Sequence, residues 1–209
     1  MDNKRWDIPT TAKGKRFLKM KKARGHWRKR SEGLKNYYTK PNVKKHKVNV
    51  GGSVNVCAGI IGGRVRVWHY LPTRWCGDEA ANVYKTVIAP ALRRWIGNKK
   101  KFISLEDNDP TGYRSNLAIA EKATQGIQPI QFPTYSPDIN PCDYALWDEV
   151  QRRMDGPKAP KNETADAFKC RLRRTALSIP EKVVRKMLSG MVPRMEAVYQ
   201  NDGGHIPRD

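Results

Sequence analysis

The chain has 209 residues, enough for one domain with a substantial core, alone or with an appendage. Its net charge is +21 and uneven, because residues 1–50 hold 17 Lys or Arg against three acids. Such a block favours a nucleic-acid partner, since neutralising phosphates releases counterions; a solvated, disordered tail is the alternative. No apolar run reaches the ~20 residues that span a bilayer, and the four cysteines are too scattered for a disulfide framework. We therefore expect a soluble, intracellular protein with no membrane partner.

The first part of the chain, residues 5–47, is basic and turn-rich and carries interleaved aromatic residues. Aromatic side chains among Lys and Arg can stack on bases. Trp6 and Trp27 can equally anchor the segment to the core, and the sequence leaves both interpretations open.

A β-hairpin is predicted after Val48, where β-branched residues over 54–61 and 64–70 flank the Gly62-Gly63 turn. Residues 78–96 then show helical spacing of apolar positions, up to Trp95, with acids in the first turn. Pro90 lies inside this helix and is expected to kink or divide it.

A short buried strand is predicted over Phe102, Ile103 and Leu105, and it runs into Asp107. A helix at about 114–124 and a strand-like piece at 128–132 follow. The next helix, 142–154, presents as core contacts Tyr144, Leu146, Trp147, Val150 and Met154. Hairpin, helix, strand, helix, strand and helix together predict an α/β fold with a mixed sheet flanked by helices.

Two further helices are predicted at the C-terminal end. Residues 163–178 carry Phe168, Leu172 and Leu177, with arginines interspersed. The last helix is expected to begin near Pro180, which suits a first-turn position. Its core residues are Val184, Met187 and Leu188, and Pro193 interrupts it.

Two acidic segments carry the functional signal. Asp107 follows a buried strand, and Asp143 follows the proline-rich turn before a helix. Carboxylates in these two places can converge on a divalent metal ion, which suits phosphodiester chemistry. Asp109 and Asp138 satisfy ordinary turn chemistry instead.

These segments resemble the catalytic core of mariner-type (Tc/mariner) DDE/D transposases, which carry D-N-x-P at the second acid and Y/W-S-P-D-L-N-P-x-E/D at the third. Leu105–Pro110 and Tyr135–Asp143 match these patterns, with 35 residues between Asp107 and Asp143. The resemblance extends over about residues 47–155. Met1–Trp6 resembles the context of the first acid, which makes Asp2 that residue, although Asn3 replaces the usual Glu.

The resemblance implies an RNase H-like fold in which Asp2, Asp107 and Asp143 bind two Mg²⁺ or Mn²⁺ ions. It implies cleavage of double-stranded DNA at transposon ends and strand transfer into target DNA, in the nucleus, and it allows for a homodimer in a DNA complex. The strand that carries Asp2, and a helix-turn-helix region, are expected to precede residue 1.

Three parts are predicted: a basic, partly extended DNA-contacting segment (1–46), an RNase H-like core (47–156) and a C-terminal helical extension (157–209). The expected DNA contacts are Lys13, Lys15, Arg16, Lys21, Lys22, Arg24, Trp27, Arg28, Lys29, Arg30, Lys44, Lys45, Lys47, Arg152 and Arg153. Two alternatives stay open. One is an inactive transposase remnant that binds nucleic acid nonspecifically, and the other is an unrelated basic RNA-binding or ribosome-associated protein.

Overall fold

The structure, a computed structural model, describes residues 1–7, 53–71, 75–133, 136–156, 160, 163–204 and 206. Its elements in chain order are β1 (Asp2–Asp7), β2 (Ser53–Ile61), β3 (Arg64–Leu71), α2 (Gly77–Val83), η3 (Tyr84–Ile88), α3 (Ala89–Ile96), β4 (Phe102–Ser104), α4 (Asn116–Gln125), β5 (Ile127–Pro129), η4 (Cys142–Leu146), α5 (Trp147–Met154), α6 (Ala165–Leu177), α7 (Glu181–Ser189) and α8 (Met191–Gln200).

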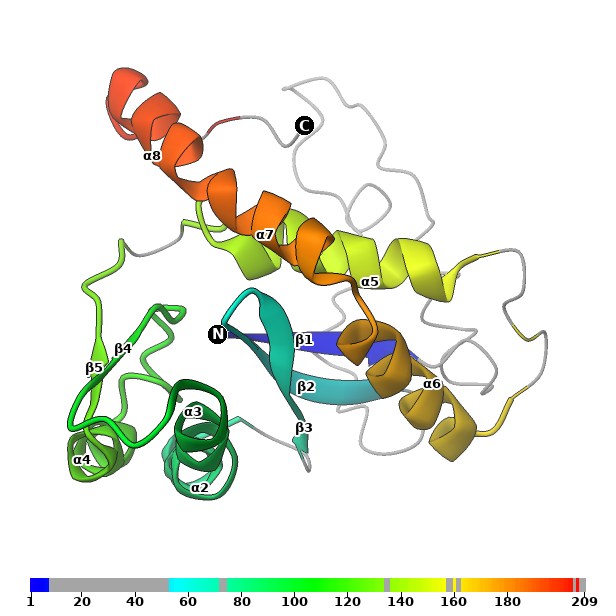
Figure 1. The fold of residues 1–209 in the computed structure, drawn as a ribbon, viewed down its shortest axis with the longest axis horizontal. Helices are drawn as coiled ribbons and strands as arrows, with labels where there is room; N and C mark the ends of the chain where they lie inside the picture. Colours follow the sequence, from blue (N-terminus) through cyan, green and yellow to red (C-terminus); the bar gives the residue numbers. More distant parts are fainter. Residues whose placement is uncertain are drawn as a thin grey trace, which may run out of the picture.

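An antiparallel sheet in the order β1-β2-β3 forms the middle layer, and helices pack on both of its faces (Figure 1). One face, with Val56 and Ala58, packs against α5, α6 and α7. The other, with Cys57 and Leu71, packs against α2, η3 and α3. Because side chains alternate along a strand, burial on both faces makes β2 almost continuously apolar. The predicted α/β class is confirmed.

Strand β1 lies at the edge of this antiparallel sheet, where Asp2 pairs with Ala58 and Trp6 with Val54. Our expectation that the strand carrying Asp2 precedes residue 1 is wrong, because Asp2 itself opens β1. Trp6 is only 5% exposed and packs edge-on against Trp147. Of the two interpretations of Trp6, the anchor to the core is therefore the correct one, whereas Trp27 lies outside the described residues.

The predicted hairpin is present as β2 and β3. Its turn needs two residues with positive φ, and Gly62 and Gly63 supply them at +59° and +77°. The predicted helix after it divides as expected: a π-helical turn, η3, precedes α3, and Pro90 lies in the first turn of α3. There the missing proline N–H is tolerated. Trp95 is 45% exposed and lies under the Arg66 guanidinium.

Strands β4 and β5 form a parallel pair. Phe102 is buried, but Ile103 is 73% exposed, so the predicted burial of Ile103 is wrong. The two sheets meet at Met1, whose nitrogen donates to the Leu105 carbonyl (2.6 Å) and whose carbonyl accepts from the Asp107 amide (3.3 Å). That is the bonding pattern of parallel strands, so the sheet β1-β2-β3 and the pair β4-β5 adjoin at this point.

The C-terminal helices α6 (Ala165–Leu177) and α7 (Glu181–Ser189) pack on the sheet. Phe168 and Leu172 of α6 and Val184 of α7 belong to the same apolar cluster as β1, β2 and α5. Leu177, at the end of α6, is 37% exposed. Pro180 is the residue before α7 rather than part of its first turn, and the break after α7 comes at Gly190, which leaves Pro193 in the first turn of α8.

Two leucines of α6 give a test of this packing. Leu172 is fully buried and Leu177 is partly exposed on the same helix. Leu172→Ala is expected to lower the free energy of unfolding by about 2–4 kcal/mol, because it leaves a cavity between the helix and the sheet. Leu177→Ala, measured beside it by urea denaturation, is expected to cost less than about 1 kcal/mol. Equal losses would show that α6 does not pack as described.

Candidate active site

The three predicted acids come from three elements that converge at one end of the sheet. Asp2 opens β1, Asp107 follows β4, and Asp143 lies in the first turn of η4. The two hydrogen bonds of Met1 hold the start of β1 against the segment after β4, which brings Asp2 and Asp107 together.

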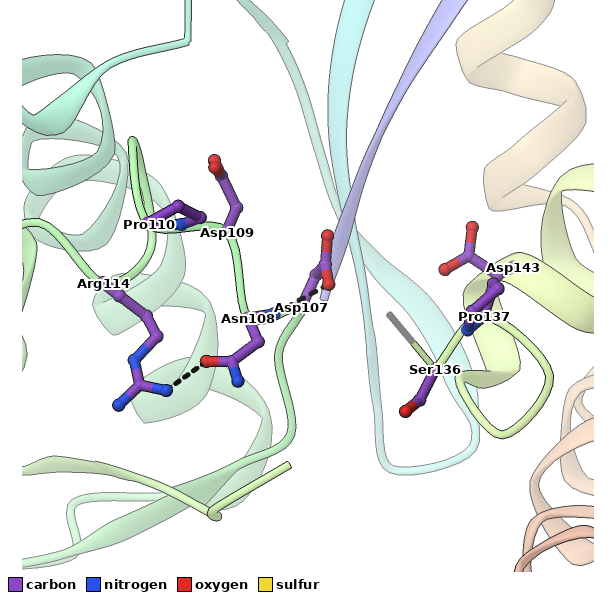
Figure 2. Close-up of a pocket in the computed structure, with 8 residues that line it drawn as sticks. All are labelled: Asp107, Asn108, Asp109, Pro110, Arg114, Ser136, Pro137 and Asp143. Atoms are coloured by element: carbon purple, nitrogen blue, oxygen red, sulfur yellow. Dashed lines mark hydrogen bonds between the residues drawn. The ribbon is translucent and has the colours of Figure 1, made fainter. Parts of the chain in front are cut away.

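Asp107 and Asp143 line a hollow of about 830 Å³. Figure 2 shows the Asp143 carboxylate pointing across this hollow toward Asp107. A second hollow, of about 270 Å³, is lined by Asp2 together with Asp107 and Asp109. Because Asp107 and Asp109 line both, the two hollows adjoin at the acids.

The three carboxyl groups interact electrostatically. Burial raises the pKa of Asp143, and repulsion from Asp2, a hydrogen bond shared with Asp2 and repulsion from Asp107 raise it further, to about 7. The pKa of Asp107 is also raised, by burial first and by repulsion from Asp2 and Asp109. Such mutual repulsion is expected where acids are gathered for a function rather than for stability.

This set of side chains fits a hard divalent cation. Carboxylate oxygens are the ligands that Mg²⁺ and Mn²⁺ prefer, and a cation relieves the repulsion that raises the pKa of Asp143. In the described part of the chain, no three His, Cys, Asp or Glu side chains already stand at ligand geometry.

Asn140 holds the turn before Asp143 together through hydrogen bonds of its side chain and its backbone. Its side-chain carbonyl accepts from the Cys142 amide (3.1 Å), and its side-chain amide donates to Asp143 Oδ2 (2.9 Å). Its backbone carbonyl accepts from the Asp143 amide (2.9 Å). Asn140 is 2% exposed. Through these hydrogen bonds it caps the start of the helix and holds the Asp143 carboxylate in place.

Asp2 is held from two sides although it is only 5% exposed. Trp147 Nε1 donates to Asp2 Oδ2 (2.6 Å), and the Asn3 amide donates to Asp2 Oδ1 (2.7 Å). Trp147 begins α5, directly after the turn that carries Asp143. The first acid is therefore bonded to the helix of the third.

A buried polar network supports the segment of Asp107. Lys122 Nζ donates to Glu106 Oε1 and Tyr84 OH to Glu106 Oε2, and Lys122 Nζ also reaches the Tyr113 carbonyl (2.8 Å). Tyr113 OH donates to Asn3 Oδ1 (2.9 Å). The network thus joins the neighbour of Asp107 to the neighbour of Asp2. Burial raises the pKa of Tyr113, which keeps its hydroxyl proton in place.

The turn after Asp107 places a positively charged side chain, that of Arg114, at the larger hollow. Asp109 Oδ1 accepts from the amide (3.0 Å) and hydroxyl (2.8 Å) of Thr111, which confirms its turn role. Arg114 donates from Nη1 to Asn108 Oδ1, and its exposed side chain lines the hollow (Figure 2). Asp138, also predicted as a turn residue, is 6% exposed, and its Oδ2 accepts from the Ile206 amide (3.3 Å).

Two of the predicted DNA contacts, Arg152 and Arg153, lie in the last turn of α5, and both bond to Glu149. Burial alone raises the pKa of Glu149, but these hydrogen bonds outweigh it and lower the pKa. The remaining predicted contacts lie outside the described residues: Lys13, Lys15, Arg16, Lys21, Lys22, Arg24, Trp27, Arg28, Lys29, Arg30, Lys44, Lys45 and Lys47.

By sequence, no family profile and no curated protein matches the chain. By structure, it is similar to the Mos1 transposase catalytic domain with raltegravir and Mn, at a TM-score of 0.64 and 17% identity over 74% of this chain and 78% of that one. It is also similar to the mariner Mos1 paired end complex with Mg (TM-score 0.70, 15% identity, 99% of this chain and 55% of that one). The Mos1 strand transfer complex gives a TM-score of 0.65 and 18% identity over 99% of this chain and 54% of that one.

The chain has the RNase H-like fold of the Mos1 transposase catalytic domain. The predicted fold is therefore confirmed. The chain spans little more than half the length of the Mos1 proteins in the paired end and strand transfer complexes.

Several residues around the acids of this RNase H-like fold escaped the sequence analysis as site residues: Asn108, Arg114, Lys122, Asn140 and Trp147. Asn140 and Trp147 stand inside or just after the motif of the third acid, so the motif itself carried that signal. The local sequence gives no sign that Lys122 is buried, because a lysine on a helix is ordinarily solvated.

The raised pKa of Asp143 predicts how pH affects stability without metal. A folded-state pKa of about 7, above the ordinary 3.8, means that this group stabilises the fold fully below about pH 4 and that the contribution is lost as pH rises through 7. We expect a loss of about 1–2 kcal/mol, since solvent reaches this half-buried carboxyl and screens its interactions.

Urea unfolding in a chelator at pH 4 to 8, of the unchanged chain and Asp143→Asn, measures this loss. Asp143→Asn should lack it, and Mg²⁺ should reduce it in the unchanged chain. The same pH dependence in both proteins would refute the assignment.

Proposed function

We propose that this chain is the catalytic domain of a mariner-type DNA transposase that cleaves DNA strands and transfers them to a target. The observation that carries this proposal is the convergence of Asp2, Asp107 and Asp143, electrostatically coupled, at one end of an RNase H-like sheet. The motifs around Asp107 and Asp143 support it independently of the fold, because they come from the sequence alone.

Asp2, Asp107 and Asp143 are the proposed ligands of divalent metal ions, two of Mg²⁺ or Mn²⁺. Bound ions supply Lewis-acid stabilisation of the oxygens that attack and leave the phosphorus atom. Structures of the Mos1 catalytic domain contain Mn or Mg, which favours the same metals here.

The other residues of the hollow position the DNA. Arg114, oriented by Asn108, offers a guanidinium to a phosphate oxygen close to the acids. Double-stranded DNA, as transposon end and as target, is the proposed partner, and the net charge of +21 provides the nonspecific attraction. Action in the nucleus, and as a homodimer on DNA, belongs to the same proposal. No helix in the described part of the chain is long and apolar enough to cross a membrane.

Nicking of supercoiled plasmid tests this function without knowledge of the terminal repeat. The chain is expected to nick the plasmid in low salt with Mn²⁺ or Mg²⁺, and to stop when a chelator is added. Binding to a labelled duplex, measured in parallel, should weaken steeply with salt.

The same experiment distinguishes the two alternatives. Salt-sensitive DNA binding without nicking at any metal concentration would identify an inactive remnant. Preferential binding of RNA, without metal-dependent cleavage of DNA, would identify an unrelated basic RNA-binding protein. Either outcome overturns the proposal.

A further inference from the structure

The indole of Trp147 differs from the other buried indoles of the protein. It is 2% exposed, and its single donor, Nε1, bonds to Asp2 Oδ2 at 2.6 Å. The buried indole nitrogens of Trp6, Trp68 and Trp75 have no hydrogen-bond partner in the described part of the chain. A core tryptophan here therefore needs no partner to pack, and the bond of Trp147 to an acid calls for its own explanation.

That bond determines which lone pairs of Asp2 are left for a cation. A carboxylate offers about four acceptor positions on its two oxygens. Trp147 occupies one on Oδ2, and the Asn3 amide occupies one on Oδ1. A hydrogen bond shared with Asp143 uses a third position, and the Trp147 and Asn3 donors fix the carboxylate plane from both sides.

Trp147 itself is rigidly placed. Its ring packs edge-on against Trp6 (centroids 6.4 Å apart) and Trp68 (6.1 Å), which come from β1 and β3. It also stands four residues after Asp143 on a continuous helical segment. A shift of that segment therefore moves the third acid and the donor to the first acid together.

We infer that Trp147 is a positioning residue that orients the Asp2 carboxylate for divalent metal and couples it to the helix of Asp143. This inference rests on the proposed function, because it takes Asp2 as a metal ligand. Donors behind metal ligands typically change metal affinity by about 10–100-fold when they are removed.

Binding of Mn²⁺ to the protein without DNA, followed by the EPR signal of the free ion, tests the inference. Trp147→Phe is expected to weaken binding about 10-fold, whereas Trp68→Phe should leave it within about twofold of the unchanged chain. Trp68→Phe is the matched control, because it removes a buried indole of the same cluster whose nitrogen has no partner in the described part of the chain. Circular dichroism and thermal unfolding without metal establish that both variants fold.

A second variant separates the hydrogen bond from the packing. Benzothienylalanine at position 147 keeps the shape of the indole and replaces its N–H with sulfur. It should weaken Mn²⁺ binding as Trp147→Phe does, and it keeps the test valid if Trp147→Phe does not fold.

The possible results are distinct. Unchanged Mn²⁺ affinity in the benzothienylalanine variant overturns the inference, and so does an equal loss in Trp68→Phe. In both cases the unchanged chain still binds Mn²⁺ and nicks DNA, so the proposed function stands. If the unchanged chain binds no Mn²⁺ and nicks no DNA, the proposed function fails and the inference fails with it.

Discussion

Asp107→Asn is expected to reduce metal-dependent DNA nicking by about 10³-fold or more, because it removes a charged ligand from the centre of the acidic cluster. Asparagine has the same size as aspartate, so the change leaves the turn intact. Without metal, the loss of one negative charge relieves repulsion on Asp143. The free energy of unfolding of Asp107→Asn should therefore be at least as high as that of the unchanged chain. DNA binding should persist, because the cationic residues are untouched.

Asp109→Asn is the matched control for this substitution. Asp109 lines the same two hollows, and its Oδ1 accepts two bonds from Thr111 that an asparagine carbonyl can still accept. We expect its nicking rate to stay within about tenfold of the unchanged chain, against the far larger loss for Asp107→Asn. Similar losses of nicking rate in both variants would mean that only the total negative charge of the hollow matters, and that Asp107 has no role distinct from that of Asp109.

Lys122→Met is expected to lower the free energy of unfolding by about 3–5 kcal/mol, the largest stability effect that we predict. Lys122 and Glu106 form an ion pair with side chains only 3% and 5% exposed. Removing the cation leaves the Glu106 carboxylate buried with Tyr84 as its remaining donor. Because Glu106 adjoins Asp107, we also expect DNA nicking to fall by more than the folded fraction falls.

Two further variants show whether this loss comes from an uncompensated charge. The double variant Glu106→Leu/Lys122→Met should recover most of the stability, since replacing both partners of a buried pair is far less costly than removing one. Arg171→Met breaks the ion pair between Arg171 of α6 and Glu163 just before that helix, whose side chains are 17% and 6% exposed and lie outside the acidic cluster. It should lower stability without a specific loss of nicking. If urea denaturation gives Lys122→Met a free energy of unfolding within about 1 kcal/mol of that of the unchanged chain, the argument is refuted.

The sequence predicts those parts of the site that local chemistry determines. The hairpin follows from its two glycines and the strand residues around them, and the second and third acids follow from motifs in which turn, cap and carboxylate stand within a few residues. Asn140 shows why such a motif is informative, because it starts the helix and bonds to Asp143 at once.

The parts that the sequence does not predict depend on distant partners. The segment Asp2–Asp7 is mostly polar and is not predicted as a strand, yet it pairs with β2 and buries Trp6. The bond from Trp147 to Asp2 joins residues 145 positions apart. Ile103 is exposed because side chains alternate along a strand, and Phe102 and Ser104 take the buried face of β4.

The hydrogen bonds of Met1 to the segment after β4 also affect the stage of folding at which Asp2 and Asp107 come together. They join positions 104 residues apart, and closing so long a loop costs chain entropy that no local contact repays. The hairpin and the individual helices form from contacts between residues close in sequence. Asp2 and Asp107, in contrast, come together only when the two hydrogen bonds of Met1 form. The three acids are therefore expected to come together late in folding, after the hairpin and the helices have formed.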